Sequence, residues 1–307
     1  IEVKHSCFIY TYPHAALMPH VQHLYLFSRP TDREDQQLRA LLSETIGAAP
    51  KASSTDTPQG RLYSYPTERS VSETELRREL LTHLIPWGRV THSAFYLPST
   101  SATAEITHVA FDLDGTLTTT ELLPELARLL GRSEEMIALT EAAMAGATPF
   151  RESFMHRTEL LRGLSREALH SVIRSITLPT DTTLLLRELS LPTAIVTGAY
   201  QPFVEDICER VGLSAFVGSA VRYTADGNFD GLDPEGIIDA EGKRAFLEEW
   251  TAGALASTLY TGDGANDLDA LAAVGHALFY TAQHGDLRGL VHQILSADLP
   301  PLFPTTR

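Results

Sequence analysis

The feature that most restricts the fold of this sequence is a set of four short apolar runs, most of which end in aspartate, glycine or threonine. The runs are ITHVAFDLD at 106–114, PTAIVTG at 192–198, STLYTGDG at 257–264 and HALFYT at 276–281. Stretches with a helical spacing of apolar residues separate them, which is typical of buried parallel strands joined by crossover helices. The sequence therefore predicts an α/β protein built on a parallel sheet.

Three further regions flank or interrupt these runs. Residues 1–97 alternate between strand-like and helix-like segments and predict a small α+β domain, followed by a polar linker at 98–105. The predicted core domain, 106–296, contains a long helical insert at about 119–188, and a Pro-rich tail follows at 297–307. In the N-terminal domain we expect strands at 6–12, 23–29, 61–66 and 91–98, and helices at 31–47 and 72–88.

Composition excludes some classes of function. With 39 acidic against 24 basic residues and a formal net charge of -15, the chain lacks the positive field that draws in nucleic acid or anionic membrane. No apolar stretch approaches the ~20 residues that span a bilayer. Cys7 and Cys208 form no CxxC pattern, so we expect two ordinary thiols in a reducing cytoplasm. Because the chain starts at Ile1 rather than Met, the sequence leaves open whether a leader segment precedes it.

Polar side chains gather where the predicted strands end, which is where open α/β sheets bind their ligands. These residues are Asp112 and Asp114 after the first core strand, Thr197 and Gly198 after the second, and Asp263 and Asp267 after the third. Because successive strand residues point to opposite faces, Asp112 and Asp114 share a side. Gly115 then permits a sharp exit from the strand.

Two adjacent carboxylates repel each other unless a cation lies between them. Mg²⁺ fits this requirement because it takes oxygen ligands from one or two protein carboxylates and a substrate phosphate. Asp263 offers a third carboxylate at the neighbouring strand end. The twelve histidines show no HxxxH spacing and the two cysteines are far apart, so the ligand set favours magnesium over zinc.

The order of four motifs resembles that of the haloacid dehalogenase superfamily. The motifs are DLDGT at 112–116, VTG at 196–198, Lys243 in EGKRAFL and GDGAND at 262–267. More narrowly, the stretch from about 106 to 296 resembles the phosphoserine phosphatases. The resemblance implies a Rossmann-like core with a parallel sheet and a helical-bundle cap inserted after the first core strand. The strand–helix alternation of residues 1–97 suggests an ACT-like, ferredoxin-type fold for the N-terminal domain, as some phosphoserine phosphatases carry.

The resemblance also implies a role for each motif residue. Asp112 would be the nucleophile that forms an aspartyl-phosphate, and Asp114 would protonate the leaving oxygen and then activate water. Asp112, the backbone carbonyl of Asp114 and Asp263 would hold Mg²⁺, and Asp267 would steady the metal site. The residues implied to bind the phosphoryl group are Thr197, Gly198, Lys243 and Asn266. Arg244 remains an alternative to Lys243 as the cation, and we interpret Asp269 as an exposed helical acid.

Two residues of the insert would recognise the substrate's amino-acid end. Glu121 lies nine residues after Asp112, and Arg157 seven after Phe150, which are the spacings of the family's serine-recognising pair. Without the family, Glu121 would be an acid in the first turn of a helix and Arg157 a surface residue. Met144 and Phe150 match apolar positions that line the family's closed pocket, and core packing explains them nearly as well.

The leading hypothesis is a Mg²⁺-dependent phosphatase acting on O-phospho-L-serine, the last step of serine biosynthesis. Transfer of the phosphoryl group to another alcohol, such as homoserine, is an alternative that shares the first chemical step. A third hypothesis is a phosphatase-like sensor acting through its N-terminal domain, in which we find no glycine-rich ligand loop. Dimerisation, scaffolding and amino-acid sensing remain open for that domain, and a homodimer is the partner arrangement we expect.

Overall fold

The computed structural model describes residues 20–46, 53–67, 71–103, 105–144, 149–296 and 299. In this part of the chain no helix is long and apolar enough to cross a membrane. The strand expected at 6–12 lies outside the described residues, as does Cys7. The same holds for the predicted tail apart from Leu299.

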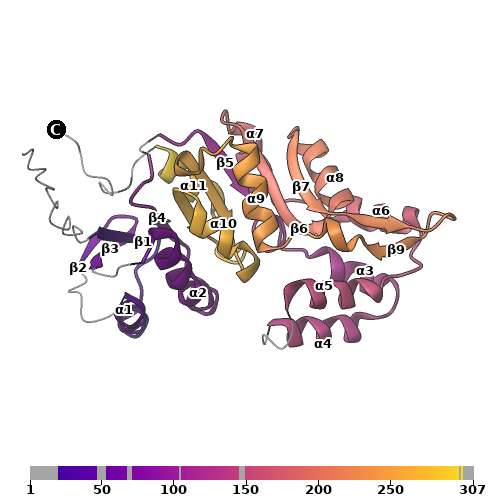
Figure 1. Ribbon diagram of the computed structural model, residues 1–307, viewed down its shortest axis with the longest axis horizontal. Helices are drawn as coiled ribbons and strands as arrows, with labels where there is room; N and C mark the ends of the chain where they lie inside the picture. The colour runs from indigo at the N-terminus through magenta and orange to yellow at the C-terminus, as the bar shows by residue number, and fades with distance from the viewer. Residues whose placement is uncertain are drawn as a thin grey trace, which may run out of the picture.

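Nine strands form one continuous mixed sheet (Figure 1). In spatial order they are β2 (Ser53–Thr57), β3 (Gly60–Thr67), β1 (His20–Leu26), β4 (Phe95–Pro98), β11 (His276–Phe279), β10 (Thr258–Gly262), β5 (His108–Phe111), β6 (Thr193–Tyr200) and β7 (Ala215–Ser219). From β11 to β7 all neighbours pair in parallel, which confirms the predicted parallel sheet. The other neighbours pair antiparallel.

Helices cover both faces of this sheet, and a small ribbon of two antiparallel strands projects from the core (Figure 1). The helices are α1 (Asp32–Ile46), α2 (Glu73–Thr91), α3 (Leu122–Leu129), α4 (Ser133–Met144), α5 (Phe150–Glu159), α6 (Arg166–Ser175), α7 (Thr180–Glu188), α8 (Gln201–Val211), α9 (Ala240–Trp250), α10 (Leu268–Ala273) and α11 (Leu287–Leu295). The ribbon pairs β8 (Val221–Tyr223) with β9 (Phe229–Leu232).

Alternating strand residues feed two hydrophobic cores, one on each face of the sheet. On β5, Val109 and Phe111 point to one core while Ala110 points to the other. The first core joins α7, α8 and α11 to the inserted helices α3 to α6, and the second packs under α1, α2, α9 and α10. Because strands buried on both faces need apolar residues at every position, the runs in the sequence are continuous rather than alternating.

The insert after β5 contains the expected helical cap. Helices α3, α4 and α5 pack on one another, and α5 also contacts β9. In Figure 1 they lie as a group below the parallel strands. Helix α7 differs, because it packs against the core helices α8 and α11. The predicted cap range of 119–188 therefore includes α7, which covers the core, and α6, which contacts both α3 of the cap and α8 of the core.

The N-terminal segment forms a βαββαβ unit with the strand order β2-β3-β1-β4, which is the ferredoxin-type arrangement. Its edge strand β4 pairs antiparallel with β11 over Phe95–Pro98, so its sheet continues into the core sheet. The connection after β4 is held to the core by two backbone hydrogen bonds, from Ser99 N–H to the Gly275 carbonyl (2.7 Å) and from Thr103 N–H to the Ala256 carbonyl (3.1 Å).

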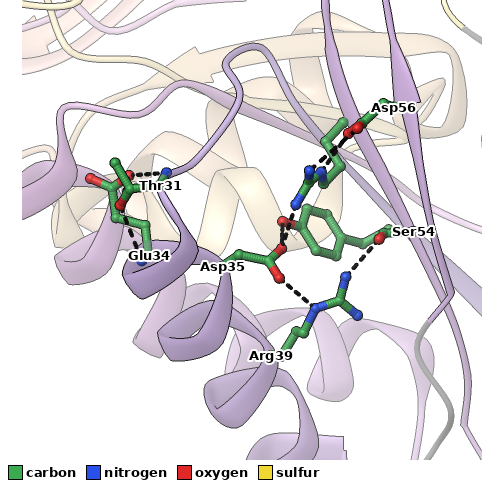
Figure 2. A network of polar contacts seen from close by, with 8 residues as sticks. Thr31, Glu34, Asp35, Arg39, Ser54 and Asp56 are labelled. Atoms are coloured by element: carbon green, nitrogen blue, oxygen red, sulfur yellow. Dashed lines mark hydrogen bonds and ion pairs between the residues drawn. The ribbon is translucent and has the colours of Figure 1, made fainter.

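A polar network ties helix α1 to the β2–β3 hairpin inside this unit (Figure 2). The Asp35 carboxylate accepts hydrogen bonds from Arg39 Nε (2.7 Å), from an Arg61 amino group (3.0 Å) and from the Tyr63 hydroxyl. Arg39 also donates to the Ser54 hydroxyl at 2.6 Å. The unexpected strand β2 is polar along its whole length, and this network helps to hold it on the sheet.

Candidate active site

The ends of β5 and β10 bring three carboxylates together. Asp112 follows β5, and its N–H donates to the Thr261 carbonyl at 2.8 Å, which extends the β5–β10 pairing by one residue. Asp112, Asp263 and Asp267 each offer a carboxylate oxygen, and these oxygens lie within 4.8 Å of one another. Sequence positions more than 140 residues apart thus meet because parallel strands present their carboxyl ends at one edge of the sheet.

Gly115 makes this approach possible. Its φ is +77°, a left-handed conformation that glycine adopts without strain, and it turns the chain away after Asp114. A Cβ atom at this position would lie 2.6 Å from Asp263 Oδ2. Any larger residue would therefore push the β10 carboxylate out of the cluster.

Lys243, on α9, is the cation at the centre of the cluster. Its side chain is fully buried, and its Nζ donates to Asp112 Oδ1 and to Asp267 Oδ1, both at 2.7 Å. Burial alone lowers the pKa of Lys243, but the charges of Asp112 and Asp267 outweigh it and raise that pKa. The alternative cation, Arg244, pairs instead with Glu248 on the exposed side of the helix.

Asp267 is fully engaged with groups of the protein. Its Oδ1 accepts from Lys243 and from the Tyr260 hydroxyl (2.6 Å), and its Oδ2 accepts from the N–H groups of Asp263 (3.1 Å) and Gly264 (3.0 Å). A carboxylate with four donors has little capacity left for a metal. Its position suits it to orient Lys243, and the predictions from sequence missed Tyr260 as its second side-chain partner.

Burial and mutual repulsion raise the pKa values of the other three acids of the site, Asp112, Asp114 and Asp263. Burial, together with the charge of Asp267, raises the pKa of Asp112 to about 6 against the opposing effect of Lys243. Burial and the charges of Asp112 and Asp267 raise the pKa of Asp263 to about 8. The pKa of Asp114 lies well above its usual value, first because of burial and then because of Asp112, Glu121 and Asp263.

This donor set fits a hard divalent cation. Lys243 alone does not offset the charge of four acids, and Asp114 Oδ1 is buried with no hydrogen-bond partner among the described residues. Carboxylate oxygens at this spacing are the ligands that Mg²⁺ prefers, and a dication would favour their ionised forms. Asp112 and Asp263 have oxygens available for it, as has Asp114.

A cleft of about 860 Å³ opens onto the cluster. Thr197 and Gly198 lie within β6, where its pairing with β7 is interrupted between Val196 and Tyr200, and they line the cleft with Asp112. Thr197 Oγ1 accepts a hydrogen bond from Ala199 N–H at 3.0 Å. Asn266 lines the same wall; with its amide oxygen facing Lys243 Nζ at 3.3 Å, its nitrogen donates to Asp267 at 3.3 Å. The predicted phosphoryl-binding residues are thus brought together.

The cap contributes the opposite wall of the cleft. Glu121 is the N-cap residue of α3, and its side chain makes no capping hydrogen bond. Arg157, on α5, is half-buried, and its Nε lacks a partner among the described residues. Burial lowers the pKa of Arg157, and Glu121 opposes that shift. Phe150 also lines the cleft, near Gly198, whereas the side chain of Met144 is outside the described residues. Glu121 and Arg157 therefore present one negative and one positive group to the same space.

Several charged residues line the cleft although the sequence did not place them there. Arg89 comes from α2 of the N-terminal unit, and Arg151 from the cap. Arg151 bridges cap and core, donating to Asp239 at 2.8 Å and to the Pro234 carbonyl at 2.6 Å. Asp269 lines the cleft and pairs with Arg78, so its interpretation as an exposed acid was wrong. None of these contacts leaves a signal in the local sequence.

The haloacid dehalogenase-like hydrolase family matches residues 109–272, which is just over half of the chain. The chain belongs to this family. The match spans β5 to α10 and so includes the whole carboxylate cluster, and it confirms the superfamily indicated by the motifs.

This hydrolase is similar to proteins named phosphoserine phosphatases. It is 31% identical over 169 residues to phosphoserine phosphatase SerB2 of Mycobacterium tuberculosis, covering 53% of this chain and 41% of that protein. To the phosphoserine phosphatase of Methanocaldococcus jannaschii it is 32% identical over 172 residues, covering 53% and 80%. A solved phosphoserine phosphatase with an analogue of the phospho-aspartyl intermediate matches with a TM-score of 0.50 and 28% identity, covering 56% and 84%. The chain thus spans less than half the length of the mycobacterial relative.

Proposed function

We propose that this hydrolase is a Mg²⁺-dependent phosphatase that converts O-phospho-L-serine to L-serine and phosphate through an aspartyl-phosphate on Asp112. The observation that carries the proposal is the geometry of Asp112, with one carboxylate oxygen held by the buried Lys243 at 2.7 Å in a cleft lined by Thr197, Gly198 and Asn266. The similarity to phosphoserine phosphatases supports the choice of substrate. A cytoplasmic location, a homodimer and a role in serine biosynthesis stay predictions.

Asp112, the carbonyl of Asp114 and Asp263 would hold the metal. When bound, Mg²⁺ supplies positive charge that neutralises the phosphoryl oxygens and so lowers the barrier to attack by an anion. The carboxylate oxygens of Asp112 and Asp263 are within 4.8 Å of each other, and both acids have raised pKa values that a nearby cation would reverse.

Asp112 and Asp114 have complementary properties for the two chemical steps. Lys243 binds Asp112 Oδ1, which leaves the second oxygen for attack on phosphorus while the bond from phosphorus to the serine Oγ breaks. Asp114, whose pKa is raised by burial and by neighbouring acids, is suited to carry the proton that the serine oxygen needs. The resulting Asp114 carboxylate would then accept a proton from the water that hydrolyses the aspartyl-phosphate.

Glu121 and Arg157 would recognise the ammonium and carboxylate groups of the substrate. Both line the cleft, and the partner-free Nε of Arg157 offers part of the planar fork that binds carboxylates. Phe150 would cover the space between them and the phosphoryl site. This arrangement supports a small zwitterionic phosphomonoester over a purely anionic one.

The deciding experiment measures phosphate release from a panel of phosphomonoesters with Mg²⁺ and with EDTA. We expect phosphoserine to have the highest kcat/KM and EDTA to abolish turnover. Equal rates on phosphoserine and on p-nitrophenyl phosphate would contradict the substrate assignment, and undiminished rates in EDTA would contradict the metal requirement. Adding homoserine and analysing the products tests the phosphotransfer alternative, since O-phosphohomoserine would then accumulate.

A further inference from the structure

Helix α2 of the N-terminal unit forms part of the active-site wall. Its last turns contribute Ile85, Pro86 and Arg89 to the lining of the cleft, beside Asp263 of the core. An Arg89 amino group lies 3.4 Å from Asp263 Oδ2 and donates to the Asp263 backbone oxygen at 3.5 Å. A guanidinium from outside the hydrolase core thus meets a carboxylate of the proposed metal site.

Arg89 is the side chain that contacts the Asp263 carboxylate. Asp112 is held by Lys243, and Asp267 by Lys243 and Tyr260. Among the described residues, the Asp263 carboxylate accepts no hydrogen bond, and its one ion pair is with Arg89. The orientation of the third carboxylate therefore depends on the N-terminal unit, unlike that of the other two.

The fold fixes α2 firmly against α10, the helix that follows the GDGAND segment. Arg77 is buried and donates to the carbonyls of Leu271 (2.9 Å), Ala272 (3.2 Å) and Val274 (2.9 Å) at the end of α10. Arg78, one residue on, pairs with Asp269 of the same helix.

Close packing adds to this attachment one residue before Arg89. A Cβ atom at Gly88 would lie 2.6 Å from Phe279 Cε1, so the helix backbone rests directly on β11. The base of the Arg89 side chain is therefore held in place by the core, while its guanidinium remains partly exposed.

We propose that Arg89 is a positioning residue that orients Asp263 for metal binding, so that the N-terminal unit completes the metal site of the hydrolase core. The inference rests on the metal site of the proposed function, and it does not depend on which phosphomonoester is the substrate. A carboxylate can bind a metal through one oxygen while a guanidinium holds the other, because it has lone pairs on both. Loss of such an outer partner typically lowers metal affinity by about 10- to 100-fold.

The test measures Mn²⁺ binding to the metal-free full chain, without substrate, by the electron paramagnetic resonance signal of free Mn²⁺. We expect Arg89→Ala to raise the Kd for Mn²⁺ by about 10- to 100-fold. Arg89→Lys, which keeps the charge but loses the fork, should give an intermediate Kd. The matched control is Arg78→Ala, which removes a cation from the same helix and the same α2–α10 interface and should leave the Kd nearly unchanged. Thermal unfolding in EDTA checks that each variant is folded.

Two results would overturn the inference. One is an Arg89→Ala variant that binds Mn²⁺ as tightly as the wild type, or more tightly because cation repulsion dominates. The other is an equal loss in Arg78→Ala, which would assign the effect to docking of α2. Asp263→Asn separates this from the proposed function: wild-type affinity there would refute the metal site itself. A failure to hydrolyse phosphoserine would refute only the substrate.

Discussion

Replacing Lys243 with methionine tests whether the buried lysine stabilises the folded protein against repulsion between the carboxylates of the cluster. Methionine keeps much of the apolar stem and removes the charge. Lys243 is fully buried and binds Asp112 and Asp267, whose side chains are 3% and 0% exposed. The substitution therefore leaves two buried carboxylates facing each other without a cation.

The expected loss in the free energy of unfolding is large for a single substitution. Removing one partner of a buried ion pair typically costs about 3–5 kcal/mol, because the other charge stays buried and unpaired. Asp267 keeps the Tyr260 hydroxyl and two N–H donors, so most of the cost falls on Asp112. We therefore expect a loss of about 3–5 kcal/mol in the free energy of unfolding at pH 8.

The pH dependence of that loss follows from Asp112. In the wild type its pKa is about 6, so it is ionised at pH 8. Without Lys243 the pKa of Asp112 rises further, and protonation relieves the repulsion as the pH falls. The difference in unfolding free energy between wild type and variant should therefore be smaller at pH 5 than at pH 8.

Urea denaturation in EDTA, followed by circular dichroism and by tryptophan fluorescence, measures the effect. Arg244→Met is the matched control, since it removes the next cation of the same helix, whose pair with Glu248 is exposed. Such a pair contributes about 0.3–0.5 kcal/mol. A loss below about 1 kcal/mol for Lys243→Met, or equal losses for both variants, would refute the reasoning.

Three further predictions concern the same site. Folding raises the pKa of Asp112 to about 6 and of Asp263 to about 8, so the folded metal-free protein holds protons that the unfolded chain releases. Its melting temperature in EDTA should fall as the pH rises from about 4 to about 8. Asp112→Asn should abolish phosphate release and acid-stable labelling by phosphoserine while leaving the circular dichroism spectrum unchanged. Arg157→Ala and Glu121→Gln should lower kcat/KM for phosphoserine by about 30-fold to several thousand-fold, from 2–5 kcal/mol per lost charge partner.

Each of these has an internal control. Saturating Mg²⁺ should flatten the pH profile of the melting temperature, and a profile that rises with pH in EDTA would contradict the pKa directions. Normal turnover in Asp112→Asn would exclude it as the nucleophile. Turnover of p-nitrophenyl phosphate, which lacks both recognised groups, should change far less in the Arg157 and Glu121 variants. Equal losses on both substrates would mean that these residues support the fold.

The predictions from sequence succeeded for structural features that depend on local spacing. The four apolar runs became β5, β6, β10 and β11. Asp112 and Asp114 both line the cleft, as the two-residue spacing led us to expect, although β5 itself ends at Phe111. The predictions left a choice open where the side chains of two adjacent residues point in different directions. Lys243 and Arg244 are adjacent, but one residue turns a helix by about 100°, so one is buried and the other exposed.

The sequence by itself determined four strands of the core sheet, the buried character of each, and the carboxylates that follow two of them. Only the tertiary structure decided that the Asp267 carboxylate accepts one hydrogen bond from Lys243 and three more from Tyr260 and two backbone N–H groups, and that α7 covers the core. It also decided that β4 pairs with β11 and brings Arg89 to Asp263 across 174 positions of the chain. Local patterns record which face of an element is apolar, whereas such long-range contacts depend on how separate elements pack, which no short stretch of sequence encodes.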